Sequence, residues 1–151
     1  METKVKVIGV GNILCGDDGL GVQAIELLKR ERVGEKVSLI RGETDAWFCM
    51  QEASETDFTI IIDAVRGGEA PGTIYIIPLL EIAQRPLIFS GHDTGLLDLI
   101  NLLSYKGINI KGLIIGMEPE VIEIKMGLSE TVSQSLKVLV QEVITILDNM
   151  K

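Results

Sequence analysis

Short β-branched runs alternate along this chain with segments in which apolar residues recur at helical spacing, and that alternation restricts the fold more than any other feature. The runs predicted as strands are residues 5–9, 37–40, 58–62, 73–77 and 113–116. Helices are predicted after Gly19, from Thr44 or Asp45 to about Glu55, from Asp93 or Thr94, and from near Ser129. We therefore expect residues 1–151 to form a single-domain α/β three-layer sandwich, with helices on both faces of a twisted, mostly parallel sheet of about five strands.

The spacing of the predicted strands also indicates their directions. Residues 73–77 follow residues 58–62 after a turn at Pro71 and Gly72. A parallel pair needs a connection of about a dozen residues or more, and this connection is shorter. We therefore expect residues 73–77 to form an antiparallel member of the sheet. Residues 121–124 are predicted to be a further short extended piece.

Composition disfavours several classes of function. The 151 residues suffice for one domain with one core. A formal net charge of -8 disfavours nucleic acid as a partner, because lysine and arginine drive phosphate binding. Cys15 and Cys49 form no CxxC pair, so no cysteine-based zinc or redox motif is predicted. No apolar run approaches the ~20 residues that span a bilayer, and no signal peptide is visible, so we expect a cytoplasmic protein without membrane insertion.

The loop after the first predicted strand only partly matches a dinucleotide-binding fingerprint. Gly9 and Gly11 fit its first two glycines, whereas Leu14 replaces the third. Asp17 and Asp18 lie where the next helix begins, and adjacent carboxylates repel the phosphate that a helix N-terminus would otherwise attract. No nucleotide cofactor is therefore expected, although a nucleotide-binding module on this loop remains an alternative. Asp17 is also a candidate helix cap, and capping or solvation stays open for Asp18.

Two more polar residues lie at the ends of predicted elements. Asp63 directly follows the apolar run 58–62, where a carboxylate is costly unless something pairs with it. Arg66 is a candidate partner, which would give Asp63 a structural role. His92 is the only histidine and lies just before a predicted helix, where Asp93 could simply hydrogen-bond to it.

Asp18, Asp63 and His92 are expected at one edge of the sheet, because ligands in open α/β sheets bind beyond the carboxyl ends of the strands. One imidazole and two carboxylates suit a borderline divalent metal ion. Such a set leaves coordination positions open, which metal-assisted hydrolysis requires. A nucleophile pair of Cys15 and His92 is the alternative in the same region.

Several segments together resemble the hydrogenase maturation endopeptidases. Gly9–Leu14 and Gly16–Gly21 are similar to the signature loop of that family. Asp63-Ala64 after an apolar strand, His92 before an apolar helix, and the run Gly116-Met117-Glu118-Pro119 match in order and spacing. The combination covers nearly the whole chain, and it is specific although each piece alone would be weak.

The resemblance implies a fold, a reaction and a set of residues. The family fold is a twisted sheet flanked by helices, and Asp18, Asp63 and His92 correspond to its metal-contacting and catalytic residues. The implied activity is that of a metal-dependent, aspartic-type endopeptidase, which removes the C-terminal extension of the nickel-loaded large-subunit precursor of a nickel–iron hydrogenase. Nickel would then be supplied by the substrate. The residues expected to bind substrate are Asn12, Asp17, Arg66 and Gly67.

Other functions remain open on the same residues. A non-catalytic nickel-binding maturation chaperone could use the same three side chains, and a different peptidase on this scaffold could act on another protein. Gly42-Glu43-Thr44 lies where many family members have a glycine-rich turn, so Glu43 adds a charge there. Trp47 and Phe48 are predicted to pack in the core, with anchoring of a partner protein as the alternative.

Overall fold

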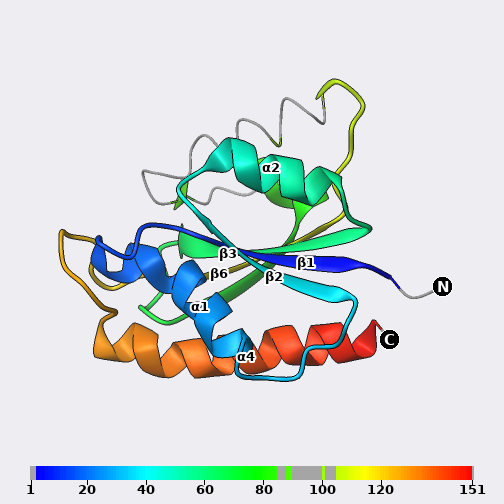
Figure 1. The fold of residues 1–151 in the computed structure, drawn as a ribbon. Helices are drawn as coiled ribbons and strands as arrows, with labels where there is room; N and C mark the ends of the chain where they lie inside the picture. The colour runs from blue at the N-terminus through cyan, green and yellow to red at the C-terminus, as the bar shows by residue number, and fades with distance from the viewer. Residues whose placement is uncertain (1–2, 85–87, 90–99, 101–104, 151) are drawn as a thin grey trace.

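The computed structural model describes residues 3–84, 88–89, 100 and 105–150. Its central sheet has the strand order β2-β1-β3-β6-β4, and β5 pairs with β3 outside that path (Figure 1). The strands are β1 (Val5–Val10), β2 (Val37–Glu43), β3 (Phe58–Arg66), β4 (Ile74–Pro78), β5 (Ile88–Phe89) and β6 (Gly112–Met117). β1 runs parallel to β2 and β3, and β3 runs parallel to β6. The predicted mostly parallel α/β sheet is confirmed.

β4 is antiparallel to its neighbour β6, as its short connection to β3 predicts. β3 itself is longer than the predicted run 58–62. Ala64 is still paired with Met117 of β6, and Val65 with Phe89 of β5. These partners satisfy the backbone groups beyond Ile62, so the strand continues. Asp63 therefore lies inside β3 instead of following it.

Helices cover both faces of the sheet (Figure 1). α1 (Leu20–Leu28) and α4 (Glu130–Asn149) lie on one face, and α2 (Ala46–Ser54) lies on the other. Successive side chains of β3 divide between them: Ile60 and Ile62 join the core under α1 and α4, whereas Ile61 joins the core under α2. Burial on both faces explains why this strand is apolar throughout.

The predicted helix starts at Asp45 and Ser129 are confirmed as N-caps. The Asp45 side chain accepts a hydrogen bond from the Phe48 N–H, and the Ser129 side chain accepts one from the Val132 N–H. Two 3-10 helices, η1 (Gly16–Gly19) and η2 (Leu79–Gln84), complete the helical elements described here. The helix predicted from Asp93 or Thr94 falls outside the described residues at its start.

Residues 121–124 do not form the predicted extended piece. In this part of the chain, β-pairing is limited to an isolated bridge between Cys15 and Lys125. The loop after β6 instead lies against the loop after β1, because Gly16 N donates to Lys125 O and Lys125 N donates to Leu14 O. None of the described helices combines the length and apolar character needed to cross a bilayer.

Glycines allow α1 to begin directly against the sheet. A Cβ at Gly21 would lie 2.2 Å from the Ile62 carbonyl oxygen and 2.5 Å from the Val10 carbonyl oxygen. A Cβ at Gly9 would lie 2.2 Å from the Gly21 carbonyl oxygen. This contact places η1, which immediately precedes α1, at the carboxyl end of β1 and beside the middle of β3.

We expect Gly21→Ala to lower the free energy of unfolding by about 2 kcal/mol, because its methyl group would overlap fixed backbone atoms. The clash should outweigh the gain of about 1 kcal/mol that alanine brings to a helix. Urea unfolding checks this, with Gln23→Ala on the same helix as the control. Equal stability of the two variants would contradict the close contact.

Candidate functional site

The loop after β1 fixes the carboxylate of Asp18. Gly11 has a φ of 132°, and a Cβ there would lie 1.9 Å from the Asp18 carbonyl oxygen. Asn12 N donates to Asp18 Oδ2 at 2.9 Å. The Asp18 side chain is fully buried, and within residues 15–29 no side chain caps η1 or α1. The capping and solvation interpretations of Asp18 are therefore wrong.

The second oxygen of Asp18 has an unusual environment. Oδ1 is buried, and no described residue donates a hydrogen bond to it. An ionised carboxylate only accepts hydrogen bonds, and leaving a buried charged oxygen uncompensated is costly. The backbone therefore orients Asp18 through one oxygen and leaves the other with capacity for a cation or an external donor.

Asp63 provides a second buried carboxylate at the same edge of the sheet. Its Oδ1 accepts from Ala64 N at 2.7 Å, and the side chain has no exposed surface. η1 packs against β3, which brings the backbone around Asp18 close to that strand. His92 lies outside the described residues, so its place beside the two carboxylates stays a prediction. Among described residues no three metal-binding side chains gather.

Asp17 holds two loops together. Its Oδ2 accepts from Glu120 N at 2.9 Å, Val121 N at 2.8 Å and Ser129 Oγ at 2.9 Å, and its Oδ1 accepts from Ser129 N at 2.7 Å. The residue has no exposed surface. Asp17 is thus neither a cap of its own helix nor available to a substrate, and both sequence-based interpretations are replaced by a structural role. It fixes the loop between β6 and α4 against the loop that carries Asp18.

We expect Asp17→Asn to lower the free energy of unfolding by roughly 2–4 kcal/mol, because the amide NH2 would face backbone N–H donors in a buried position. Chemical denaturation measures the loss. The exposed Glu142→Gln, on α4, removes the same charge without a buried partner and should change stability little. A similarly small effect of Asp17→Asn would show that the loop is held by other contacts.

Arg66 does not pair with Asp63. The two residues are three positions apart in β3, so their side chains leave opposite faces of the sheet. Arg66 is exposed, and within the described chain it forms no ion pair. Gly67 follows it and donates its N–H to Glu118 Oε1 at 2.8 Å. Binding of substrate by Arg66, Gly67 and Asn12 stays a prediction.

Glu118 is a positioning residue that the sequence-based reasoning did not single out. It is 6% exposed, and its Oε1 accepts from Tyr75 Oη at 2.6 Å and from the N–H groups of Gly67 and Glu69 at 2.8 and 3.2 Å. Glu118 thereby holds the loop of residues 67–69, which directly follows β3, the strand that contains Asp63. We call this contact the clamp. A signal was present, because Glu118 directly follows the apolar strand β6, which is the same pattern that singled out Asp63 in the sequence.

The clamp changes the protonation behaviour of both partners. Burial disfavours the charged form of Glu118, but hydrogen bonds from Tyr75, Gly67 and Glu69 outweigh it and hold the pKa of that carboxyl below its usual value. Burial, together with the hydrogen bond to Glu118, raises the pKa of Tyr75 to about 12. The pair therefore favours a charged carboxylate and a neutral phenol.

The raised pKa of Tyr75 predicts a stability difference that depends on pH. Near neutral pH the free energy of unfolding of wild type should exceed that of Tyr75→Phe by roughly 1.5–3 kcal/mol, which is the usual contribution of a hydrogen bond to a charged group. This contribution is fully present below the unfolded pKa of 10.0 and is lost as pH rises through about 12. Urea unfolding of both proteins across that range measures the difference. A constant difference would contradict the clamp.

Glu43 ends β2 in a left-handed backbone conformation with a φ of 51°, and the other described residues with positive φ are glycines. This conformation costs a side chain about 1–2 kcal/mol. The Glu43 carbonyl accepts from Gly11 N at 2.8 Å, so the conformation joins β2 to the loop that carries Asp18. The ion pair with Arg41 spans 3.5 Å between exposed side chains and contributes below about 1 kcal/mol, so it does not offset the strain.

An open depression of about 330 Å³ adjoins this loop. Its lining residues are Gly11, Asn12, Ile13, Leu14, Glu43 and Thr44. Trp47 follows closely in the chain and is 71% exposed, while Phe48 is 37% exposed. The prediction that both aromatics pack in the core is wrong, because α2 buries Cys49, Met50 and Ala53 instead.

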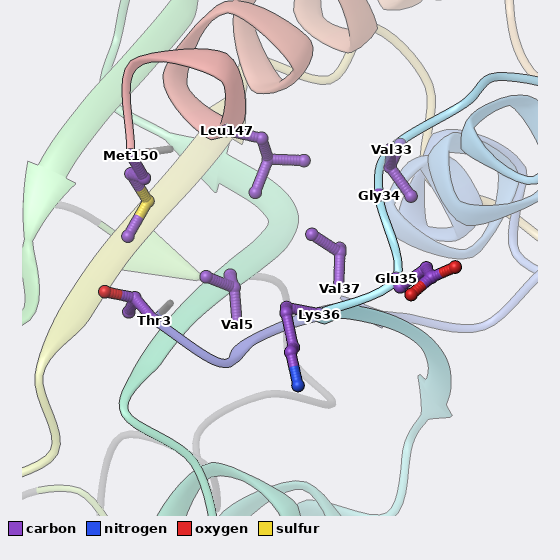
Figure 2. Close-up of a pocket in the computed structure, with 9 residues that line it drawn as sticks. All are labelled: Thr3, Val5, Val33, Gly34, Glu35, Lys36, Val37, Leu147 and Met150. Atoms are coloured by element: carbon purple, nitrogen blue, oxygen red, sulfur yellow. The ribbon is translucent and has the colours of Figure 1, made fainter. Parts of the chain in front are cut away.

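Another cavity lies at the opposite end of the strands (Figure 2). It measures about 200 Å³, and the aliphatic side chains of Val5, Val37 and Leu147 surround it. Val5 and Val37 are the first residues of β1 and β2, so this cavity lies at their amino ends. Among the described residues that line it, Glu35 is the one carboxylate, and Asp18 and Asp63 are not part of this cavity.

Known proteins share both sequence and fold with this chain. The family model for hydrogenase maturation protease matches residues 22–146. The hydrogenase 2 maturation protease of Escherichia coli K12 is 31% identical over 151 aligned residues, which cover 95% of this chain and 90% of that protein. The hydrogenase expression/formation protein HoxM of Azotobacter vinelandii is 36% identical over 126 residues, which cover 79% of this chain but only 59% of HoxM.

The same relationship extends to solved structures. The hydrogenase maturating endopeptidase HybD from Escherichia coli superposes with a TM-score of 0.85 at 30% identity. The superposition covers 99% of this chain and 93% of that chain. The superposition therefore includes the sheet and the loops that carry Asp17 and Asp18.

Proposed function

The chain belongs to the hydrogenase maturation protease family, and from this premise we propose that it removes the C-terminal extension from the nickel-loaded large-subunit precursor of a nickel–iron hydrogenase. The observation that supports the site most directly is the carboxylate of Asp18. One of its oxygens is oriented by Asn12 N–H, and the other is buried without a described donor. A cation brought by the substrate would compensate that oxygen.

Nickel is part of the substrate in this proposal. Asp18, Asp63 and His92 together form the contact to the nickel centre of the precursor. Two carboxylates and an imidazole match the ligands that a borderline divalent ion accepts. A precursor without nickel would leave Asp18 Oδ1 uncompensated, so docking would favour the loaded form. The same three residues then act as a checkpoint before cleavage.

The hydrolysis itself breaks one peptide bond. A water molecule adds to the scissile carbonyl carbon, the C–N bond breaks, and the departing amine takes up a proton. A buried carboxylate at the edge of the sheet suits general-base activation of that water. Asp63 is the candidate for this step because it lies inside a rigid central strand, which fixes its position.

The surface around Asp18 offers room for an extended tail. The depression formed by residues 11–14 and 43–44 lies on one side of the loop. Leu14 is 56% exposed. Ile124 and Met126, in the loop between β6 and α4, are 94% and 65% exposed. Lys125 N donates to Leu14 O at 3.0 Å, so these apolar side chains belong to neighbouring backbone segments. They form an apolar rim that a partner protein would cover.

Replacing the proposed nickel contacts tests this function. We expect Asp18→Asn, Asp63→Asn and His92→Ala each to reduce cleavage of nickel-loaded precursor at least about a hundredfold, since each removes a charge or ligand used in recognition or hydrolysis. Intact mass of the precursor measures cleavage, and thermal unfolding verifies that each variant is folded. Glu142→Gln, on the exposed side of α4, is the control with unchanged activity.

Wild-type protein should release a C-terminal peptide from loaded precursor and leave nickel-free precursor intact. Full activity of all three folded variants would refute the site. Tight binding of loaded precursor without any mass change would instead support a nickel-binding maturation chaperone.

A further inference from the structure

We infer that Glu43 is a specificity-determining residue, which binds a lysine or arginine side chain of the precursor segment next to the scissile bond. This inference rests on the proposed endopeptidase function and goes beyond it by naming the chemistry of one substrate contact. Six described residues line the depression next to the loop that carries Asp18, and Glu43 is the only charged residue among these six. A side chain that enters the depression therefore meets a single carboxylate.

The position of Glu43 is tied to the proposed site through the backbone. Its carbonyl accepts from Gly11 N at 2.8 Å, and the next residue along, Asn12, donates its N–H to Asp18 Oδ2 at 2.9 Å. Hydrogen bonds from two adjacent backbone N–H groups thus connect the Glu43 carbonyl to the Asp18 carboxylate. A ligand that contacts Glu43 lies along the same loop as a group held at Asp18.

The left-handed conformation argues that the side chain has a use other than folding. Only the Glu43 carbonyl enters the hydrogen bond to Gly11, and glycine would provide the same carbonyl without steric strain. The side chain is 59% exposed, and its ion pair within the described part of the chain is with Arg41 at 3.5 Å, while Arg41 also contacts Glu26 at 3.3 Å. The Glu43 carboxylate can therefore exchange this long contact for a cationic group of the substrate.

The test compares Glu43→Gly and Glu43→Asn with wild type. Both substitutions tolerate the left-handed conformation and remove the charge. We expect each to raise the KM for nickel-loaded precursor about three- to tenfold with kcat unchanged, as loss of a partly exposed ionic contact would do. The increase should shrink at high salt, which screens exposed charges. The Tm of Glu43→Gly should not fall and should rise by up to about 2 °C.

A charge partner on the precursor completes the test. Each lysine or arginine near the cleavage site is changed to glutamine, and the KM of every precursor variant is measured with wild type and with Glu43→Gly. One substitution should raise the KM for wild type and have no further effect with Glu43→Gly, which identifies the partner. Glu142→Gln serves as the matched charge control on a remote surface and should leave KM unchanged.

The outcomes separate the two claims. Unchanged KM for both Glu43 variants, with a wild type that cleaves loaded precursor, would overturn this inference alone. A changed KM for Glu43→Gly but not for Glu43→Asn would assign the effect to the backbone and also overturn it. A folded wild type that leaves loaded precursor intact would overturn the proposed function and this inference together.

Discussion

The site depends on a single buried carboxylate that never needs to touch a substrate. Asp17 receives four hydrogen bonds, from Glu120, Val121 and both the backbone and side chain of Ser129. These bonds connect the loop after β1 to the loop before α4 across more than a hundred positions of sequence. Ser129 is itself the N-cap of α4, so the same contact fixes where the last helix begins. Asp18 directly follows Asp17, so the same network also holds the backbone that carries the buried Asp18 side chain.

Close backbone contact supplies the other constraint. α1 begins against the carbonyl groups of β1 and β3, which only glycine permits at Gly21. Gly11 likewise lies against the Asp18 backbone, because a Cβ at this position would overlap the Asp18 carbonyl oxygen. As a result η1 packs against the carboxyl end of β1 and against β3 near Ile62. Placing carboxylates there costs solvation energy, and hydrogen bonds from backbone N–H groups offset part of it.

Much of the fold could be predicted from sequence, because its strands and helices follow local patterns. The antiparallel direction of β4 follows from a connection too short for a crossover helix, and the starts of α2 and α4 follow from Asp45 and Ser129. The extent of β3 could not be predicted, since β5 and β6 supply the partners that prolong it beyond Ile62. Local periodicity contains no information about such distant pairings.

The roles of individual carboxylates were harder to predict, for a physical reason. Asp17 and Asp18 are adjacent and chemically identical in sequence, and their difference lies in the donors that each meets after folding. The four donors to Asp17 belong to Glu120, Val121 and Ser129, which are more than a hundred positions away in sequence. The prediction that Trp47 packs in the core was wrong for a similar reason. Folding buries Cys49, Met50 and Ala53 of α2 and leaves the Trp47 side chain exposed.

The number of hydrogen-bond donors separates Asp18 from the structural carboxylates Asp17 and Glu118. A carboxylate has roughly four sites at which it can accept a hydrogen bond. Asp17 fills them with four donors from the protein, and Glu118 uses one oxygen to gather three. Asp18 is as deeply buried as Asp17, yet among the described residues a single N–H donates to its side chain. Burial without saturation is unfavourable in the free protein, and it becomes favourable only when a cation or donor arrives from outside. That difference supports the proposal that Asp18, and not its neighbour, meets the nickel of a substrate.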